Sequence, residues 1–409
     1  MTVVGRRSSP YASRGVRLWV QVPGRCFSGA LILAGCLGQM CIQTAPVPSG
    51  VTAGGEFGLQ VLSDAPAPPS ALNSATSDEP RDALKRTFTG DKGQWIRRAS
   101  AATASRFPEV DAFMWFNMNK ERDWRVDSSS ASLTAFRESF SHLAAGVFLE
   151  SYPRTTPADT APIDAYEQMV GRHQDRVGWY EALTNVYPGV AIAAVQARGS
   201  IPYIVWEPYD SRIPGETPYG SYSRLAEIAA GRYDAQILAW ARGAASNGGP
   251  IEICFGHEMN GDWYAWGILN AHNGNTGALY VRAYRHVVDL FDSAGATNVS
   301  WVWVINASWH DDFSEAFPGA EYVDRLGING HNWGGDPAGA DPAWAKWREF
   351  ENIFGRWNLS DPASFNNIRA LAALADRPVM IAEFASAEGR APEEQKRPAG
   401  GTPHYTQTD

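Results

Sequence analysis

The sequence predicts an α/β fold, a closed (β/α)8 TIM barrel. From Val110 onward, eight strand-like runs alternate with helical or loop segments, and this alternation is typical of parallel β/α architecture. A chain of 409 residues also has room for one barrel of about 250 to 300 residues together with other segments. No repeat of fixed period is evident in the sequence, which gives no support to a solenoid.

The expected elements follow in chain order. Residues 91–107 are predicted to form a helix, and residues 110–117 a strand. Residues 129–146 are predicted to form a helix that a serine caps and Gly146 ends. Among the later helices, the pattern is clearest over 277–295. The other seven strands are expected within residues 147–153, 176–183, 200–210, 250–258, 298–306, 323–333 and 377–386.

Residues 1–42 have the order of a secretory leader, a basic head followed by an uncharged apolar run over 26–42. This run is short for a membrane span and suits a signal segment. Leu33-Ala34-Gly35-Cys36 resembles a bacterial lipoprotein box, which makes Cys36 a candidate for lipidation. We therefore expect a secreted or extracytoplasmic protein, free or lipid-anchored at the cell surface. An uncleaved membrane anchor is the alternative.

The rest of the chain divides into three parts. Residues 43–86 are rich in Pro, Ala and Ser without a sustained period, as in a linker. Residues 87–386 are expected to form the catalytic barrel, and residues 387–409 a polar C-terminal tail.

Charge and cysteine content exclude several classes of protein. The net charge is −9 although the first fifty residues carry five Arg and no acid, so the remainder is more acidic still and does not suit a nucleic-acid partner. Cys254 is the single cysteine outside the leader, which excludes an internal disulfide there. We expect a monomer that meets the membrane only through its leader or lipid anchor.

Two glutamates at strand ends are the candidate catalytic residues. In a β/α barrel the active site lies at the C-terminal ends of the strands. Glu258 ends one strand in the stretch CFGHEMNGDWYAWG, and Glu383 ends another in MIAEFAS. A retaining glycosidase needs two carboxyl groups about 5 to 5.5 Å apart, one as acid/base and one as nucleophile. Two such charges push their pKa values apart, so that one carboxyl stays protonated near neutral pH.

Metal or cofactor chemistry finds little support in the sequence. His257-Glu258 lacks the second histidine of an H-E-x-x-H site, and no cysteine pair has zinc spacing. There is no G-x-S-x-G elbow and no Gly-rich phosphate loop. We expect no metal and no cofactor.

The segment HEMNGDWYAWG (257–267) resembles the signature of glycoside hydrolase family 26, the retaining β-mannanases and their relatives, which have a (β/α)8 fold. Further similar segments follow in the family's order over roughly residues 147–386. The resemblance implies that Glu258 is the general acid/base and Glu383 the nucleophile. It also implies that His257 and Trp263 shape the site around the cleaved bond.

One part of this resemblance is out of order. Residues 90–136 resemble the family's C-terminal end, its last helix pair and eighth strand, yet here they precede the first strand. We predict a circular permutation in which the strand over 110–117 still closes the barrel, between 378–384 and 147–151. A truncated tandem copy and an error in sequence assembly are the alternatives.

Two positions depart from the family pattern. Cys254 stands where the family usually has an arginine four residues before the acid/base, and a neutral thiol cannot replace that charge. His331 stands where the family has a tyrosine that hydrogen-bonds the nucleophile. A histidine could make the same bond, but as a cation it would hold Glu383 ionised and change the pH profile.

Aromatic and amide side chains near the strand ends complete the predicted site. Flat aromatic rings suit the apolar face of a sugar, and amides and hydroxyls suit its rim. The candidate substrate-binding residues are His257, Asn260, Trp263, Tyr264, Trp266, Trp115, Trp206, His331, Asn332 and Trp333.

The sequence thus predicts a retaining endo-β-glycosidase that binds a polysaccharide. β-1,4-Mannan is the first expectation, and mixed-linkage β-glucan, β-xylan and an exopolysaccharide stay open. The alternative is a non-catalytic carbohydrate-binding barrel that lost turnover through the changes at Cys254 and His331.

Overall fold

A computed structural model describes residues 20–22, 25–27, 90–120, 122–150, 152–153, 158–270, 272–307, 313–335, 347–355 and 367–388. The chain divides into two compact units, Met1–Arg86 and Thr87–Asp409. In the first unit, strands β1 (Val20–Val22) and β2 (Arg25–Phe27) form an antiparallel pair. The predicted lipidation site, Cys36, and the tail beyond residue 388 lie outside the described residues.

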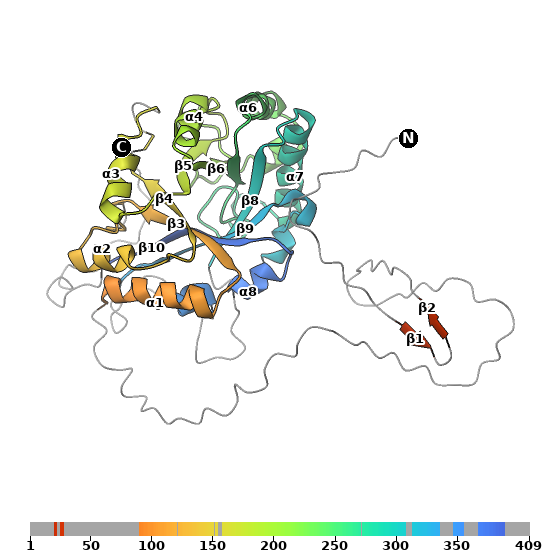
Figure 1. Cartoon of the computed structure of the whole chain (residues 1–409). Coiled ribbons are helices and arrows are strands. Elements are labelled where there is room, and N and C mark those ends of the chain that lie inside the picture. Colours follow the sequence, from red (N-terminus) through yellow and green to blue (C-terminus); the bar gives the residue numbers. More distant parts are fainter. Residues whose placement is uncertain are drawn as a thin grey trace. The chain divides into compact units, whose positions relative to one another are not determined.

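The second unit is built on a closed barrel of eight parallel strands in the order β10-β3-β4-β5-β6-β7-β8-β9, which confirms the predicted fold class (Figure 1). Seven of the eight strands lie within their predicted ranges, and β4 begins three residues before its range, at Ala144. The eight strands are β3 (Val110–Asn117), β4 (Ala144–Leu149), β5 (Arg176–Ala182), β6 (Ile201–Glu207), β7 (Ile251–Phe255), β8 (Val299–Asn306), β9 (Arg325–Asn332) and β10 (Val379–Ser386).

The barrel closes between its first strand in the chain and its last. β3 pairs with β10 through the partners Val379 and Val110, and with β4 through Trp115 and Val147. β10 pairs in turn with β9. The segment 110–117 therefore fills the place predicted for it, between the strand that carries Glu383 and the next strand along the chain.

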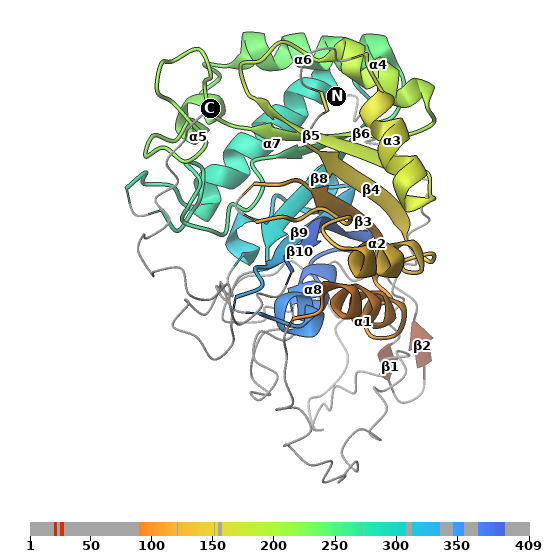
Figure 2. The same cartoon turned by 90° about the vertical axis from the view of Figure 1, so that its left-hand side faces the viewer.

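Helices follow one another round the outside of the barrel (Figures 1 and 2). Asp91, Ser129 and Thr276 each cap a helix by accepting a backbone N–H with the side chain, so these starts are encoded locally. The α-helices are α1 (Lys92–Ser105), α2 (Ser130–Arg137), α3 (Ala161–Val170), α4 (Gly189–Ala197), α5 (Leu225–Ala229), α6 (Asp234–Asn247), α7 (Gly277–Ser293) and α8 (Asn367–Ala372). Shorter 3-10 or π turns are Ser314–Ala316, Ala320–Tyr322 and Glu351–Gly355.

The helix predicted over 129–146 is wrong in its second half. α2 ends at Arg137, and the chain is already in β4 from Ala144. Gly146 is part of this strand, where a Cβ atom would lie 2.0 Å from the sulfur of Met114. The glycine is required by packing inside the barrel, and it is not a helix stop.

Strand residues alternate between the covering helices and the barrel interior. On the outer face, Trp206 of β6 stacks on Trp240 of α6 with ring centroids 4.5 Å apart. In the interior, near the N-terminal ends of the strands, Arg176 of β5 makes two hydrogen bonds of 2.7 and 2.9 Å to Glu252 of β7. Arg325 of β9 also lies 3.7 Å from Glu252 and pairs with Asp111 of β3. These ion pairs join four strands.

Replacing Glu252 with glutamine is expected to lower the free energy of unfolding by about 3 to 5 kcal/mol, because it leaves the buried Arg176 charge without its partner. The Arg176 and Glu252 side chains are only 7% and 8% exposed. Urea unfolding measures the change. Glu138→Gln is the matched control, because the Arg97–Glu138 pair is 49% and 59% exposed and should contribute less than about 1 kcal/mol. Equal stability of the two variants would contradict the expectation.

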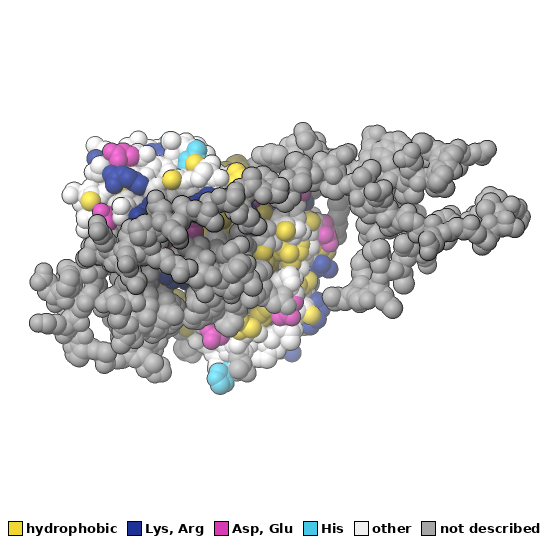
Figure 3. Space-filling view, turned by 90° about the horizontal axis from the view of Figure 1, so that it is seen from below, with side chains coloured by type: hydrophobic (Ala, Val, Ile, Leu, Met, Phe, Trp, Pro, Cys, Tyr) yellow, Lys and Arg dark blue, Asp and Glu magenta, His cyan; other side chains and the backbone are white. Residues whose placement is uncertain are grey.

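Surface charge on the barrel is mixed where it can be seen. On the face in Figure 3, Lys and Arg side chains lie next to Asp and Glu side chains. Among the described residues, no helix is both long and apolar enough to cross a membrane.

Candidate active site

Glu258 lies just after β7, at the C-terminal end of the barrel. The chain turns sharply here, since Gly256 has a φ of 58° and Glu258 itself a φ of 52°. A left-handed conformation is unfavourable for a glutamate, at about 1 to 2 kcal/mol. Its backbone N–H donates to Val304 O of β8 at 2.9 Å, which fixes the turn against the next strand. Such local strain is common at functional sites.

Two donors hold the Glu258 carboxyl group. Asn306 Nδ2 donates to one carboxyl oxygen at 2.8 Å, and Trp263 Nε1 donates to the other at 2.9 Å. Burial raises the pKa of Glu258, and these two hydrogen bonds lower it in part. Asn260 places Asn306, because the Asn260 side chain accepts from Asn306 N at 2.8 Å and donates to Asn306 O at 2.9 Å.

Glu383 lies on β10 at an irregularity in the strand, where the pairing with β9 shifts between Ile381 and Glu383. The residue is buried. Burial raises its pKa well above the usual range, and the charge of Glu258 raises it further. A hydrogen bond from Tyr180 of β5 acts in the opposite direction. Its Oε1 accepts no hydrogen bond from the described residues.

The two carboxyl groups therefore form one titrating pair. Each is buried, and the negative charge of either one disfavours ionisation of the other. Such coupling separates the two pKa values, which is what proton donation next to a nucleophile requires.

His257 precedes the acid and is neutral. Burial lowers its pKa to about 3. Its Nε2 lies 2.9 Å from the Tyr264 hydroxyl. Tyr264 is stacked between two rings, Trp266 at 4.4 Å and Tyr219 at 5.4 Å. Trp266 is fully buried and donates to His257 O at 2.6 Å, so it supports the site from behind and is not a sugar platform.

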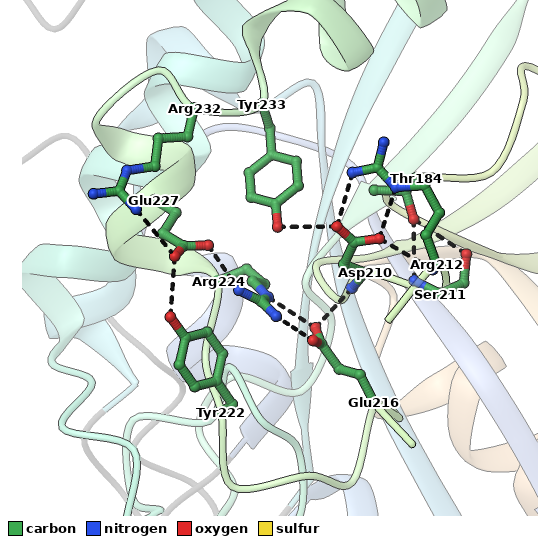
Figure 4. Close-up of polar contacts among 10 residues, drawn as sticks. All are labelled: Thr184, Asp210, Ser211, Arg212, Glu216, Tyr222, Arg224, Glu227, Arg232 and Tyr233. Atoms are coloured by element: carbon green, nitrogen blue, oxygen red, sulfur yellow. Dashed lines mark hydrogen bonds and ion pairs between the residues drawn. The ribbon is translucent and has the colours of Figure 1, made fainter. Parts of the chain in front are cut away.

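Tyr219, which stacks on Tyr264, belongs to the long loop between β6 and α5. Figure 4 shows the polar contacts of this loop around Arg224. Inside the loop, the buried Arg224 donates to Glu216 at 2.9 Å and to Glu227 at 2.9 Å. Glu216 also accepts from Asp210 N at 2.8 Å. The carbonyl of Pro218, next to Tyr219, accepts from Ala265 N at 2.7 Å, which joins this loop to the loop that carries Tyr264.

Two of the predicted sugar platforms are wrong. Trp115 is fully buried against Phe136 of α2, at 5.1 Å, and Trp206 is fully buried against Trp240 of α6. Both indoles point outward from the strands into the layer of helices and cannot meet a sugar.

Asn260 and Asn332 hold the site together and have no free edge for substrate. Asn332 is fully buried, donates to Ser386 Oγ at 3.0 Å and accepts from Arg348 N at 2.8 Å. Of the predicted binding residues, Trp263, Tyr264, His331 and Trp333 are partly exposed. His331 and Trp333 both pack on Trp124, each with ring centroids 5.1 Å away.

Comparison with known proteins tests the family resemblance. Residues 226–339 match the family model described as glycosyl hydrolase family 26. The resemblance to family 26 is confirmed. The chain is 32% identical over 259 residues to Endoglucanase H of Acetivibrio thermocellus, which is 61% of this chain and 25% of that protein. It is 32% identical over 78 residues to a mannan endo-1,4-beta-mannosidase of Bacillus subtilis, which is 18% of this chain and 21% of that protein.

The chain thus spans about a quarter and a fifth of the length of these two relatives. Among solved structures, it is similar to a GH26 beta-mannanase from Bacteroides ovatus at 13% identity and a TM-score of 0.41. The similarity covers 72% of this chain and 77% of that one. The circular permutation relative to family 26 stays a prediction, because no comparison tests the order of the strands.

Cys254, the first position that departs from the family 26 pattern, lies in the barrel interior. The thiol is fully buried, and burial raises its pKa, so it is neutral. The Tyr203 hydroxyl lowers this pKa in part. A different cation acts on the site, since the charge of Lys120, in the loop after β3, lowers the pKa of Glu258 and of Glu383.

His331 is the second position that departs from the family 26 pattern, in which a tyrosine is expected there. In this protein a tyrosine from another strand takes the place beside the nucleophile. Tyr180 of β5 lies close enough to Glu383 for its hydroxyl to lower the pKa of that carboxyl group. Tyr180 also stacks on Phe148 at 5.3 Å, which fixes its ring. Tyr180 is not among the predicted site residues, although its place near the end of the strand-like run RVGWYEAL is a signal for it.

Tyr180→Phe is expected to move the acid limb of the kcat/KM profile to higher pH and to lower the plateau roughly tenfold. The Tyr180 hydrogen bond lowers the pKa of Glu383, so its loss raises that pKa, and the nucleophile ionises only at higher pH. Tyr152→Phe is the control, because the Tyr152 hydroxyl bonds Ala191 O, outside the site. A Tyr180→Phe profile that coincides with the wild-type profile contradicts the assignment.

The described residues contain no group of three or more His, Cys, Asp or Glu side chains that could hold a metal ion.

Proposed function

We propose that the protein is a retaining endo-β-glycosidase that cleaves a β-linked polysaccharide by double displacement. The pair Glu258 and Glu383 supports this most directly, since both carboxyls are buried at one end of the barrel and each has a raised pKa. Glu383 attacks the anomeric carbon while Glu258 protonates the leaving oxygen, and Glu258 then deprotonates the water that releases the sugar.

The partners of Glu258 fit this exchange of roles. While Glu383 is ionised, its charge favours the protonated form of Glu258, the acid. Once Glu383 is esterified in the glycosyl-enzyme, that charge is gone. The donors Asn306 and Trp263 then stabilise ionised Glu258, the base that the second step needs.

β-1,4-Mannan is the first substrate we propose, because two relatives from Bacillus are named mannan endo-1,4-beta-mannosidase. β-Glucan is the second, because the relative matched over 259 residues is named an endoglucanase. A non-catalytic carbohydrate-binding barrel is the alternative suggested by Cys254 and His331. The effect of the Tyr180 hydroxyl, which lowers the pKa of Glu383, argues against that alternative.

The test is hydrolysis of β-1,4-mannan, mixed-linkage β-glucan and β-xylan by the wild type and by alanine variants at Glu258 and Glu383. New reducing ends from the wild type alone support the enzyme. NMR of the first product then gives its anomeric form, and a β-anomer indicates retention. Binding without cleavage would favour the carbohydrate-binding alternative.

We also propose that the protein is exported, secreted or lipid-anchored through Cys36, on the basis of its leader-like first 42 residues. Mass spectrometry of the protein from its native membrane fraction tests whether Cys36 is the lipidated N-terminus.

A further inference from the structure

A third buried carboxyl group lies at the mouth of the barrel, and double displacement does not use it. Glu207 is the last residue of β6 and is 8% exposed. Its backbone carbonyl accepts from Leu183 N and Tyr209 N, at 2.8 Å each. Within the described part of the chain, its carboxyl group makes no hydrogen bond. Its carboxyl oxygens are not among the fully buried atoms without a partner, so water or a ligand can reach and bond them.

The Glu207 side chain points into the site. Its neighbour Trp206 points outward to α6, so alternation along β6 directs Glu207 into the barrel. Its charge acts on three groups that come from three different elements. It raises the pKa of Glu383 on β10, of Tyr180 on β5, and of Tyr264 in the loop after β7.

A half-buried carboxyl close by shows how this protein satisfies such a group when no ligand is involved. Glu181 of β5 lies one strand away, paired in register with Trp206. Burial raises its pKa as well. Its two oxygens accept from Trp179 Nε1 and Asn185 Nδ2, each at 2.9 Å. The carboxyl of Glu207 lacks partners of this kind.

The protonation state of Glu207 suits a neutral ligand. Burial raises its pKa to about 8, although the charge of Lys120 opposes this in part. Near pH 7 the group is mostly a neutral acid, with one O–H donor and free acceptor positions. A sugar hydroxyl also donates and accepts, so the two groups are complementary. A uronic acid unit would add a further negative charge beside Glu258 and Glu383, which is unfavourable.

We propose that Glu207 binds a hydroxyl group of a neutral sugar unit next to the cleaved bond and thereby helps to determine which glycan the site accepts. The proposal rests on the proposed function, because that function is the reason for expecting a glycan as the ligand. It adds to that function a binding residue on β6, which is separate from the two carboxyls that carry out the chemistry.

The test is affinity electrophoresis in native gels that contain soluble β-1,4-mannan or mixed-linkage β-glucan. The full chain carries Glu383→Ala as a background, so that the glycan is not digested during the run. Glu207→Met keeps the length of the side chain and removes its hydrogen bonds, and it is expected to weaken binding about tenfold. Glu207→Gln keeps a donor and an acceptor and should bind within about threefold of the background. Glu181→Gln is the matched control and should leave binding unchanged.

Thermal unfolding of each variant shows whether it is folded. Two results would overturn the proposal: a folded Glu207→Met variant that binds both glycans as tightly as the background, or a background protein that binds neither glycan. Cleavage by the chain with Glu383 intact is measured separately. Weaker binding by Glu207→Met without any cleavage by that chain would support Glu207 as a ligand and would reject the proposed glycosidase. Cleavage by that chain together with unchanged binding by Glu207→Met would support the proposed glycosidase and would reject Glu207 as a ligand.

Discussion

Replacing Glu383 with alanine is expected to lower kcat for β-glycan hydrolysis by about 10^4-fold or more, because no other group can form the glycosyl-enzyme. Its Oε1 accepts no hydrogen bond from the described residues, which leaves that oxygen available to attack. The alanine also removes a negative charge next to Glu258, so the pKa of Glu258 should fall. The measurement is the rate of reducing-end release from β-1,4-mannan or β-glucan, whichever the wild type cleaves.

An added small anion separates loss of the nucleophile from misfolding. Azide can enter the space left by the Glu383 carboxyl and attack the anomeric carbon of an activated aryl β-glycoside directly. That attack inverts the carbon once and gives an α-glycosyl azide. A variant that keeps more than about 1% of wild-type turnover would contradict the nucleophile assignment, since a covalent intermediate cannot be dispensable in this mechanism. Glu181→Ala is the matched control, because this half-buried carboxyl accepts hydrogen bonds from Trp179 and Asn185 and is not part of the proposed reaction.

Much of the barrel could be predicted from the sequence because its signals are local. Eight apolar runs with polar ends predict eight strands. The barrel closes as expected, because β3, its first strand in the chain, lies between β10 and β4. Glu258 and Glu383 could also be predicted, because a polar residue at the end of an apolar strand is conspicuous. The end of α2 could not be predicted, since the segment after Arg137 keeps a helical pattern. Gly146 there packs against Met114 inside the barrel and does not end a helix.

The direction of individual side chains was harder to predict, because both faces of a parallel barrel strand are apolar. A shift of one residue turns a side chain from the interior to the helix layer. Trp206 and Glu207 show the consequence. The tryptophan suggested a sugar platform, but it packs on α6, and the adjacent glutamate faces the site. Tyr180 was missed for a related reason, because its bond to Glu383 joins strands that are not neighbours in the barrel.

Replacing Glu258 with alanine is expected to lower kcat/KM on a polysaccharide by about 10^2- to 10^4-fold, while the effect on the first step should be much smaller for an aryl glycoside with an acidic phenol. A sugar alkoxide is a poor leaving group and needs the proton from Glu258, whereas an acidic phenolate leaves without it. The second step still lacks its base, so the glycosyl-enzyme should accumulate. Stopped-flow measurement of phenol release should then show a burst followed by slow turnover.

The pH dependence gives an independent test of the same residue. Because Glu258 must be protonated to act as the acid, its ionisation should cause the fall of kcat/KM on the alkaline side. Burial raises the pKa of Glu258, which moves that fall to higher pH than for an ordinary glutamate. Glu258→Ala should abolish this alkaline limb, and Glu181→Ala should keep it. If Glu258→Ala loses the same factor on polysaccharide and on the activated aryl glycoside, and keeps the alkaline limb, then Glu258 is not the proton donor. The hydrogen bonds from Asn306 and Trp263 would in that case only hold a buried charge.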